Sequence, residues 1–150
     1  EETAMSQTNP DHANGHHTKT NADLGEYKAI VDLHEKGYIV SNPLTEHAPF
    51  DFIVWRNGEA NTVQVKYRSK DDSGKVNVRF RATQWNTDGP YNAEINTDAI
   101  DVYCVYCPES DECYYFDPDR FGKSITIRIE DPKNNQTKGI NFAEDFKQVP

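Results

Sequence analysis

The sequence predicts an α/β domain of the α+β kind, in which one N-terminal helix precedes a mixed, mainly antiparallel sheet of about six or seven strands. Two observations support this prediction. Apolar residues recur with helical spacing over residues 23–36, and short apolar or alternating segments separated by turn residues follow from residue 38 onward. A chain of 150 residues suffices for one domain with its own core. We therefore expect a single domain over residues 22–150, after a polar, disordered tail over residues 1–21.

The predicted helix, DLGEYKAIVDLHEK, has a start and a stop signal. Asp23 is expected as its N-cap, with Glu26 as the capping-box partner, and Gly37 as the residue that ends it. On a helical wheel Glu26 falls inside the apolar arc, where an unpaired carboxylate is costly. Glu26 therefore either closes the capping box at an open helix end or points at a cation inside the fold.

Residues 49–68, PFDFIVWRNGEANTVQVKYR, predict a β-hairpin. Asn57-Gly58 is the strongest short hairpin signal, because both residues tolerate the positive φ of a tight two-residue turn. A turn of that length places Arg56 opposite Glu59 and fixes the register of both strands.

The same register gathers polar groups on one face of the hairpin. Asp51 falls opposite Gln64, and Lys66 lies two residues further along on the same face. The opposite face is apolar, with Phe50, Phe52, Val54, Val63, Val65 and Tyr67.

The remaining strands are predicted from shorter patterns. We expect a short buried strand at 38–40, an alternating strand at 75–81, a central strand at 99–107, and two further strands at 113–116 and 124–129. Residues 82–97 indicate a loop or a short helix with a loop, and residues 142–146 one helical turn.

Charge is unevenly distributed along the chain. The net charge of −9 by itself argues against a nucleic-acid partner, because phosphate binding requires positive potential. Residues 66–81 nevertheless form a basic segment, which could contact phosphates or be an ordinary solvated strand face. Its cations are Lys66, Arg68, Lys70, Lys75, Arg79 and Arg81.

The cysteines and the apolar runs bear on location. Three cysteines fit reduced thiols better than a disulfide framework. Cys104-x2-Cys107 resembles half of a zinc site, but Cys113 supplies only a third ligand, and the first two would point to opposite faces of a strand. No apolar run has the length of a membrane span, so we expect a cytoplasmic protein without a membrane partner.

Four polar groups converge if the helix packs across the hairpin face that bears Asp51. Asp51, Glu26 and Gln64 are then oxygen ligands suited to Mg²⁺, with Mn²⁺ a possible substitute. Lys66 is placed to position or deprotonate a water and to offset charge on a phosphoryl group. The alternative is a simple cross-strand ion pair of Asp51 and Lys66, with Gln64 incidental.

These residues also carry a family resemblance. Pro49-x-Asp51 followed by Gln64-x-Lys66, with a helical Glu26 upstream, resembles the PD-(D/E)XK nuclease superfamily, with glutamine in place of the central acid. Residues 22–117 are similar to the small group I intron-encoded homing endonucleases. The resemblance implies a restriction-endonuclease-like core in which the N-terminal helix carries an active-site glutamate. It also implies that Asp51, Glu26, Gln64 and Lys66 are the catalytic residues.

The expected function is a Mg²⁺-dependent DNA endonuclease that hydrolyses phosphodiester bonds with a metal-activated water. Double-stranded DNA is the expected partner, with Arg68, Lys70, Lys75, Arg79 and Arg81 as its contacts. A homodimer or homotetramer is expected, because cutting both strands calls for two sites. The alternatives are a structure-selective resolvase of the Holliday-junction type and a catalytically silent nucleic-acid-binding module.

Overall fold

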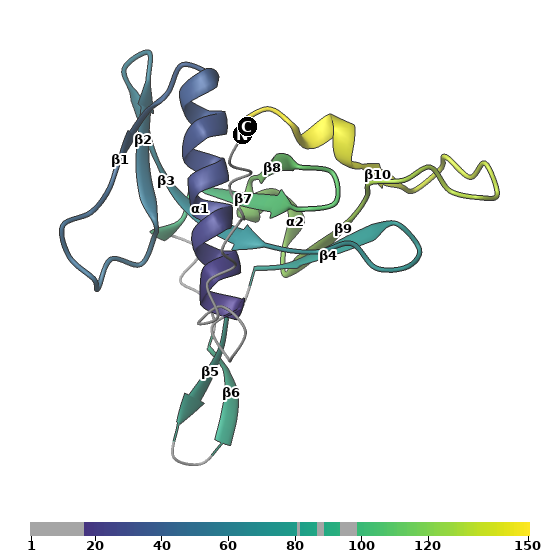
Figure 1. The fold of residues 1–150 in the computed structure, drawn as a ribbon, viewed down its shortest axis with the longest axis horizontal. Helices are drawn as coiled ribbons and strands as arrows, with labels where there is room; N and C mark the ends of the chain where they lie inside the picture. Colours follow the sequence, from purple (N-terminus) through teal and green to yellow (C-terminus); the bar gives the residue numbers. More distant parts are fainter. Residues whose placement is uncertain (1–16, 81, 87–88, 94–98) are drawn as a thin grey trace, which may run out of the picture.

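The computed structural model describes residues 17–80, 82–86, 89–93 and 99–150 (Figure 1). Residues 1–16 of the predicted tail and the predicted DNA contact Arg81 lie outside these ranges. In chain order the elements are α1 (His17–Glu35), β1 (Ile39–Ser41), β2 (Phe52–Arg56), β3 (Glu59–Tyr67), β4 (Lys75–Arg79), β5 (Ala82–Asn86), β6 (Gly89–Ala93), β7 (Val102–Cys107), β8 (Glu112–Phe116), α2 (Pro118–Phe121), β9 (Ser124–Arg128), β10 (Asn141–Phe142) and the 3₁₀ turn η3 (Ala143–Phe146).

The strands form three separate sheets. The main sheet has the order β1-β2-β3-β7-β8, and its pairs are antiparallel except for the parallel pair β3–β7. A second sheet has the order β10-β9-β4, and β5 pairs only with β6. The fold class is thus confirmed, with an N-terminal helix and a mixed, mainly antiparallel main sheet.

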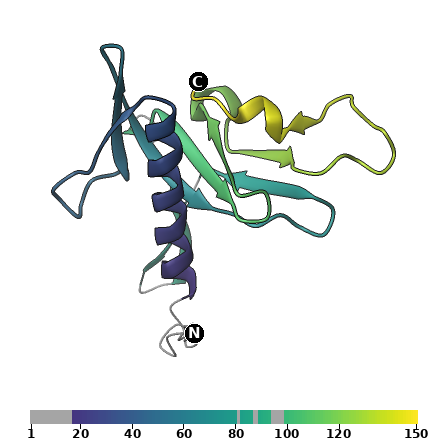
Figure 2. The same ribbon diagram turned by 45° about the horizontal axis from the view of Figure 1, so that its top comes forward.

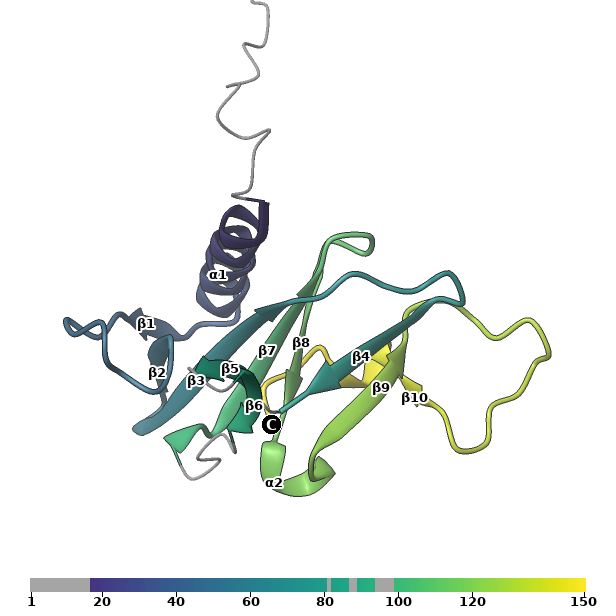
Figure 3. The same ribbon diagram turned by 90° about the horizontal axis from the view of Figure 1, so that it is seen from below.

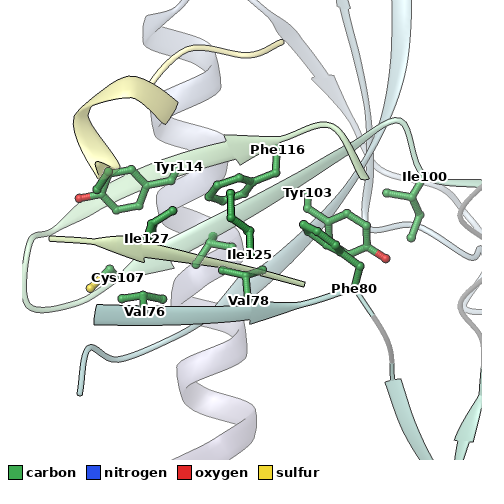
Figure 4. Packing of buried hydrophobic residues seen from close by; sticks show 12 residues of the cluster. Val76, Val78, Phe80, Ile100, Tyr103, Cys107, Tyr114, Phe116, Ile125 and Ile127 are labelled. Atoms are coloured by element: carbon green, nitrogen blue, oxygen red, sulfur yellow. The ribbon is translucent and has the colours of Figure 1, made fainter. Parts of the chain in front are cut away.

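Two apolar layers lie on opposite faces of the main sheet. On one face, α1 packs through Ala29 and Leu33 against residues of β2, β3, β7 and β8. On the other, the sheet of β4, β9 and β10 packs against β7 and β8 (Figure 3). Phe80, Tyr103 and Phe116 fill the centre of this second layer (Figure 4). All six residues of β7 are buried, because the strand is covered on both faces.

The predicted hairpin is confirmed in turn type and register. Arg56 pairs with Glu59, and Asn57 and Gly58 have φ angles of 53° and 83°. These angles are the left-handed ones that a two-residue turn of the primed type needs. The turn therefore fixes which face of β2 and β3 each side chain occupies, as expected from the sequence.

Three details of the prediction were wrong. The helix begins at His17 and not at Asp23, so Asp23 is not its N-cap, and residues 17–21 are helical. Apolar periodicity does not mark this first part, because residues 18–20 are exposed and bury nothing. Residues 82–86 and 89–93 form a hairpin where we expected a loop or short helix (Figure 1). The expected single sheet is divided, because β4 and β9 cross over the main sheet and form a second layer.

The C-terminal segment closes the second layer. After β9, a long loop extends beyond the strands before β10 returns parallel to β9 (Figure 2). The helical turn expected at 142–146 is present as η3, where Phe146 stacks on Phe116 with ring centroids 5.0 Å apart. No helix in the described part of the chain is long and apolar enough to cross a membrane.

Candidate active site

The site lies where the hairpin partner of β3 ends. β2 pairs with β3 from Glu59 to Val63, whereas β7 pairs with its other edge from Val63 to Tyr67. Over residues 64–67, β3 is therefore paired on one edge, and its second edge is open to other groups.

Asp51 occupies the start of this open edge. Its N–H donates to the carbonyl of Val63 at 2.9 Å, which extends the ladder of β2 and β3 by one residue. Beyond it the chain turns away at Pro49, which has no N–H for a further ladder bond. The Oδ2 of Asp51 instead accepts from the N–H of Val65 at 2.7 Å. The carboxylate thus replaces a missing backbone partner, and this bond holds it at a fixed place beside β3.

Glu26 reaches the same place from α1. The helix comes very close to β3 at Gly25, which is buried. A Cβ at that position would lie 3.5 Å from the Cβ of Tyr67 and 3.7 Å from the Cγ1 of Val65. Because the two backbones approach this closely, the next residue, Glu26, lies within hydrogen-bonding reach of the Asp51 carboxylate.

Both carboxyl groups have raised pKa values. Burial raises the pKa of Glu26, and the nearby negative charge of Asp51 adds to the effect. Burial also raises the pKa of Asp51, against the opposing effect of the hydrogen bond from Val65. The two carboxyl groups interact electrostatically, so they titrate as a pair. This pair binds a proton more readily than isolated carboxylates do.

Lys66 lies on the other face of β3, beside the second apolar layer. Its Nζ donates to the carbonyl of Arg79 at 2.6 Å and sits 5.5 Å from the ring centroid of Tyr103. Burial lowers the pKa of Lys66 to about 8, and the charge of Arg68 contributes. A lysine in this state is partly neutral near physiological pH and can accept a proton.

We expected the helix to pack across the polar face of the hairpin, which bears Asp51, and this expectation was wrong. Gln64 and Lys66 pair in register with Tyr103 and Val105, which belong to the layer that faces β4 and β9. The helix covers the opposite, apolar face. It packs there because the apolar residues of α1 need an apolar surface. Glu26 and Asp51 still meet, because they do so at the open edge of β3.

The donor set suits a small divalent cation. Mg²⁺ binds oxygen ligands, keeps several waters and is usually held by one or two carboxylates together with substrate phosphates. Asp51 and Glu26 supply two adjoining carboxylates, and burial is the main cause that raises both pKa values. Within the described ranges no three His, Cys, Asp or Glu side chains group together as a metal site, so further ligands would be Gln64 and water.

Comparisons with known proteins identify the family. A sequence model of the PD-(D/E)XK endonuclease family matches residues 16–149. The chain belongs to this family. In structure, this PD-(D/E)XK endonuclease is similar to the bacterial homing endonuclease I-Ssp6803I, with a TM-score of 0.71, 22% sequence identity and coverage of 87% of this chain and 88% of that one. A search of curated proteins gave no match.

The predicted DNA contacts of the endonuclease are spread over its surface near the site. Arg79 is exposed on β4, and Arg68 is exposed just after β3, where its Nη1 donates to the carbonyl of Tyr67 at 2.8 Å. Lys75 lies at the other end of β4. Lys70 is paired with Glu130 at 3.1 Å, so its charge is already compensated within the chain.

Sequence reasoning missed two residues that shape the site of the endonuclease. Gly25 permits the close approach of α1 to β3, and a glycine inside a predicted helix was the available signal. Tyr103 places its ring under Lys66, and nothing in the sequence linked the two. The Tyr103 hydroxyl is buried and has no hydrogen-bond partner among the described residues, and burial raises its pKa to about 12.

The cysteines of the endonuclease are structural. All three are buried free thiols, and Cys104 and Cys107 belong to opposite apolar layers. This is the arrangement that an alternating strand predicts for residues three apart. Their side chains fill the core in place of a metal site.

Proposed function

We propose that the chain is a Mg²⁺-dependent endonuclease of the homing type that cleaves double-stranded DNA. The observation that carries the proposal is the pair of adjoining carboxylates, Asp51 and Glu26, at an open strand edge that also bears Lys66 with a pKa of about 8. Few purely structural arrangements keep two carboxylates and a lysine all shifted toward their neutral forms.

Each residue has a role in the proposed reaction. Asp51 and Glu26 would hold the cation, and Gln64 would add a neutral oxygen or orient a water. A bound divalent cation lowers the pKa of water and stabilises charge on a phosphoryl group. Lys66 in its neutral form accepts the proton of the attacking water. A bond then forms between the water oxygen and phosphorus, and the bond from phosphorus to the leaving oxygen breaks in line with it.

A plasmid-cleavage assay with Mg²⁺ tests the proposal. We expect the wild type to cut double-stranded plasmid, and we expect Asp51→Ala and Lys66→Ala each to reduce cleavage by at least about 10³-fold. Circular dichroism and thermal denaturation check that both variants stay folded. Cleavage that survives in both variants would contradict the assignment.

One further substrate, a four-way junction, separates the alternatives. The junction is assayed beside the plasmid under the same conditions. Cutting of the junction alone would assign the chain to the structure-selective resolvases. DNA binding without cleavage of either substrate would assign it to the silent binding modules.

We also propose that the enzyme assembles as a homodimer or homotetramer. Support comes from the outward face of α1, where Leu24, Tyr27 and Val31 are 39%, 63% and 55% exposed. These residues are three and four apart, so they form one apolar stripe that faces away from the sheet. We expect the double variant Tyr27→Ser with Val31→Ser to be monomeric by light scattering and to nick plasmids rather than linearise them. An unchanged mass would exclude this face as the interface.

A further inference from the structure

The outward face of β4 and β9 is a two-stranded ribbon of hydrogen-bonding side chains. β4 pairs with β9 in antiparallel register, and their apolar residues, such as Val78 and Ile127, face inward and are buried. The outward positions form three cross-strand pairs, and none of the six residues is acidic. The pairs are Lys75 with Arg128, Asn77 with Thr126, and Arg79 with Ser124.

This composition departs from the rest of the chain. The protein has 25 acidic and 16 basic residues, yet the six outward positions carry three cations and three neutral polar groups. Acidic residues flank the far end of the ribbon, at Asp71, Asp72, Glu130 and Asp131, and the Oδ1 of Asp71 accepts from the N–H of Lys75 at 2.9 Å. A locally positive strip on an acidic protein is the electrostatic pattern expected where a polyanion binds.

The near end of the ribbon is attached to the candidate site. Lys66 Nζ donates to the carbonyl of Arg79, the last residue of β4. Because an antiparallel strand rises about 3.4 Å per residue, Asn77 lies roughly 7 Å and Lys75 roughly 14 Å further from that point. Stacked base pairs are also about 3.4 Å apart along the duplex. Successive cross-strand pairs are therefore spaced by about two base pairs.

The central pair of the ribbon has the geometry of a base reader. The Nδ2 of Asn77 donates to the Oγ1 of Thr126 at 3.0 Å, which fixes the orientation of the amide. The second N–H of that amide and its Oδ1 remain for a ligand, and together they match the N7 acceptor and N6 donor of adenine. Both residues are exposed. At the far end, Arg128 donates to the carbonyls of Ser73 and Glu130, at 3.1 and 3.3 Å. Its guanidinium is therefore better suited to contacting a phosphate, which positions the protein on the duplex, than to reading a base.

We propose that the β4–β9 ribbon enters the major groove of double-stranded DNA beside the scissile phosphate and reads its sequence there, with Asn77 specifying an adenine about two base pairs from the cut. The inference rests on the proposed nuclease function and adds to it the surface that selects the target. The major groove is wide enough for a two-stranded ribbon, and the flanking cations Arg79, Lys75 and Arg128 anchor it to the phosphates.

The test is a selection of bound duplexes from a randomised pool in EDTA, so that no cleavage occurs. The wild type, Asn77→Ala and a matched control, Asn42→Ala, are compared. Asn42 is an exposed asparagine just after β1, which belongs to the main sheet and not to the sheet of β4 and β9. We expect the wild type and the control to select adenine at one fixed position. We expect Asn77→Ala to lose that preference by roughly 5- to 100-fold and to keep the others.

The outcomes separate this inference from the proposed function. Selection by Asn77→Ala of the same adenine, or recovery of no preferred sequence by the wild type, would overturn the ribbon proposal. Thermal denaturation shows whether Asn77→Ala is folded, and Asn77→Asp, which cannot donate to N7, gives the same test if it is not. Cleavage of the selected duplex with Mg²⁺ is measured separately. Binding with the expected preference but without cleavage would contradict only the nuclease assignment.

Discussion

Replacement of Lys66 by methionine tests whether this ammonium is held in the fold against its preference for water. Burial and the neighbouring charge of Arg68 lower the pKa of Lys66 from 10.5 to about 8. Methionine has a similar unbranched shape without charge, so it keeps the packing over Tyr103 and removes the titrating group. The variant therefore isolates the effect of that one charge.

The expected change has a definite sign and size. Between pH 8 and 10.5 the unfolded chain binds a proton on Lys66 that the folded protein has released, so the free energy of unfolding of the wild type rises with pH relative to Lys66→Met. A tenfold change in proton affinity is worth about 1.4 kcal/mol. The full effect between pH 7 and pH 10 is about 2.5 kcal/mol. Solvent screening of this partly exposed side chain reduces it to roughly 1 kcal/mol.

Guanidinium denaturation of both proteins at pH 7 and pH 10, in EDTA, measures this quantity. Subtracting the free energies of unfolding of the two proteins at each pH removes the contribution of the other titrating groups. Comparing that difference between pH 7 and pH 10 then removes the constant contribution of the lost hydrogen bond to Arg79. Lys75→Met serves as the control for a lysine replacement outside the site. A stability difference that stays constant between pH 7 and pH 10, or that moves in the opposite direction, would refute the depressed pKa of Lys66.

Three further predictions concern the rest of the site. Gln64→Glu adds a carboxylate, so we expect it to lower the Mg²⁺ concentration for half-maximal cleavage by roughly tenfold; an unchanged metal dependence would remove Gln64 from the metal site. Gly25→Leu should push α1 away from β3, lower the free energy of unfolding by about 1–3 kcal/mol in chemical denaturation and abolish cleavage. The Cβ of Gly25→Ala makes only ordinary contacts, so this variant should keep cleavage and gain up to about 1 kcal/mol in the free energy of unfolding. Tyr103→Phe removes a buried hydroxyl but keeps the ring under Lys66, so thermal denaturation should show stability unchanged or raised by about 1 kcal/mol; loss of cleavage in this folded variant would give the hydroxyl a part in the reaction.

The parts of the fold that local chemistry determines were predictable from the sequence. Asn57-Gly58 allows few turns other than a two-residue primed one, and that turn fixed the register of β2 and β3 before any tertiary contact was known. The alternation of residues 75–80 likewise indicated which side chains of β4 face inward. In both cases the signal lies within a few residues and is independent of what packs above.

The failures concern features that depend on distant segments. Residues 17–21 extend the packed part of α1 as helix. They carry no apolar pattern, so the sequence gives no periodic signal for this extension. The division into two sheets depends on β4 pairing with β9, about fifty residues away. Alternation indicates that a strand has two faces but not which sheet it joins. For the same reason the link between Lys66 and Tyr103 required the parallel pairing of β3 with β7.

The candidate site residues were predicted to converge through a helix placement that was wrong, and the correction bears on their proposed chemistry. A helix packed across the polar face would have buried Gln64 and Lys66 beneath α1 and closed the site to a duplex. With α1 on the apolar face, its carboxylate meets Asp51 at the open edge of β3, while the ammonium of Lys66 lies beside β4 on the carbonyl of Arg79. In the proposed reaction a substrate phosphate approaches along this open edge, beside the carboxylates.

The pKa values of the three ionisable groups follow from that arrangement. Burial raises the pKa of Glu26 and Asp51 and lowers that of Lys66, so the fold disfavours the charged form of each group. A cation beside the carboxylates reverses their shift and therefore binds in part by relieving a cost already present. The neutral fraction of Lys66 near physiological pH is what a proton acceptor needs. If the proposed function holds, the burial that makes these charged groups costly would also prepare them for metal binding and proton transfer.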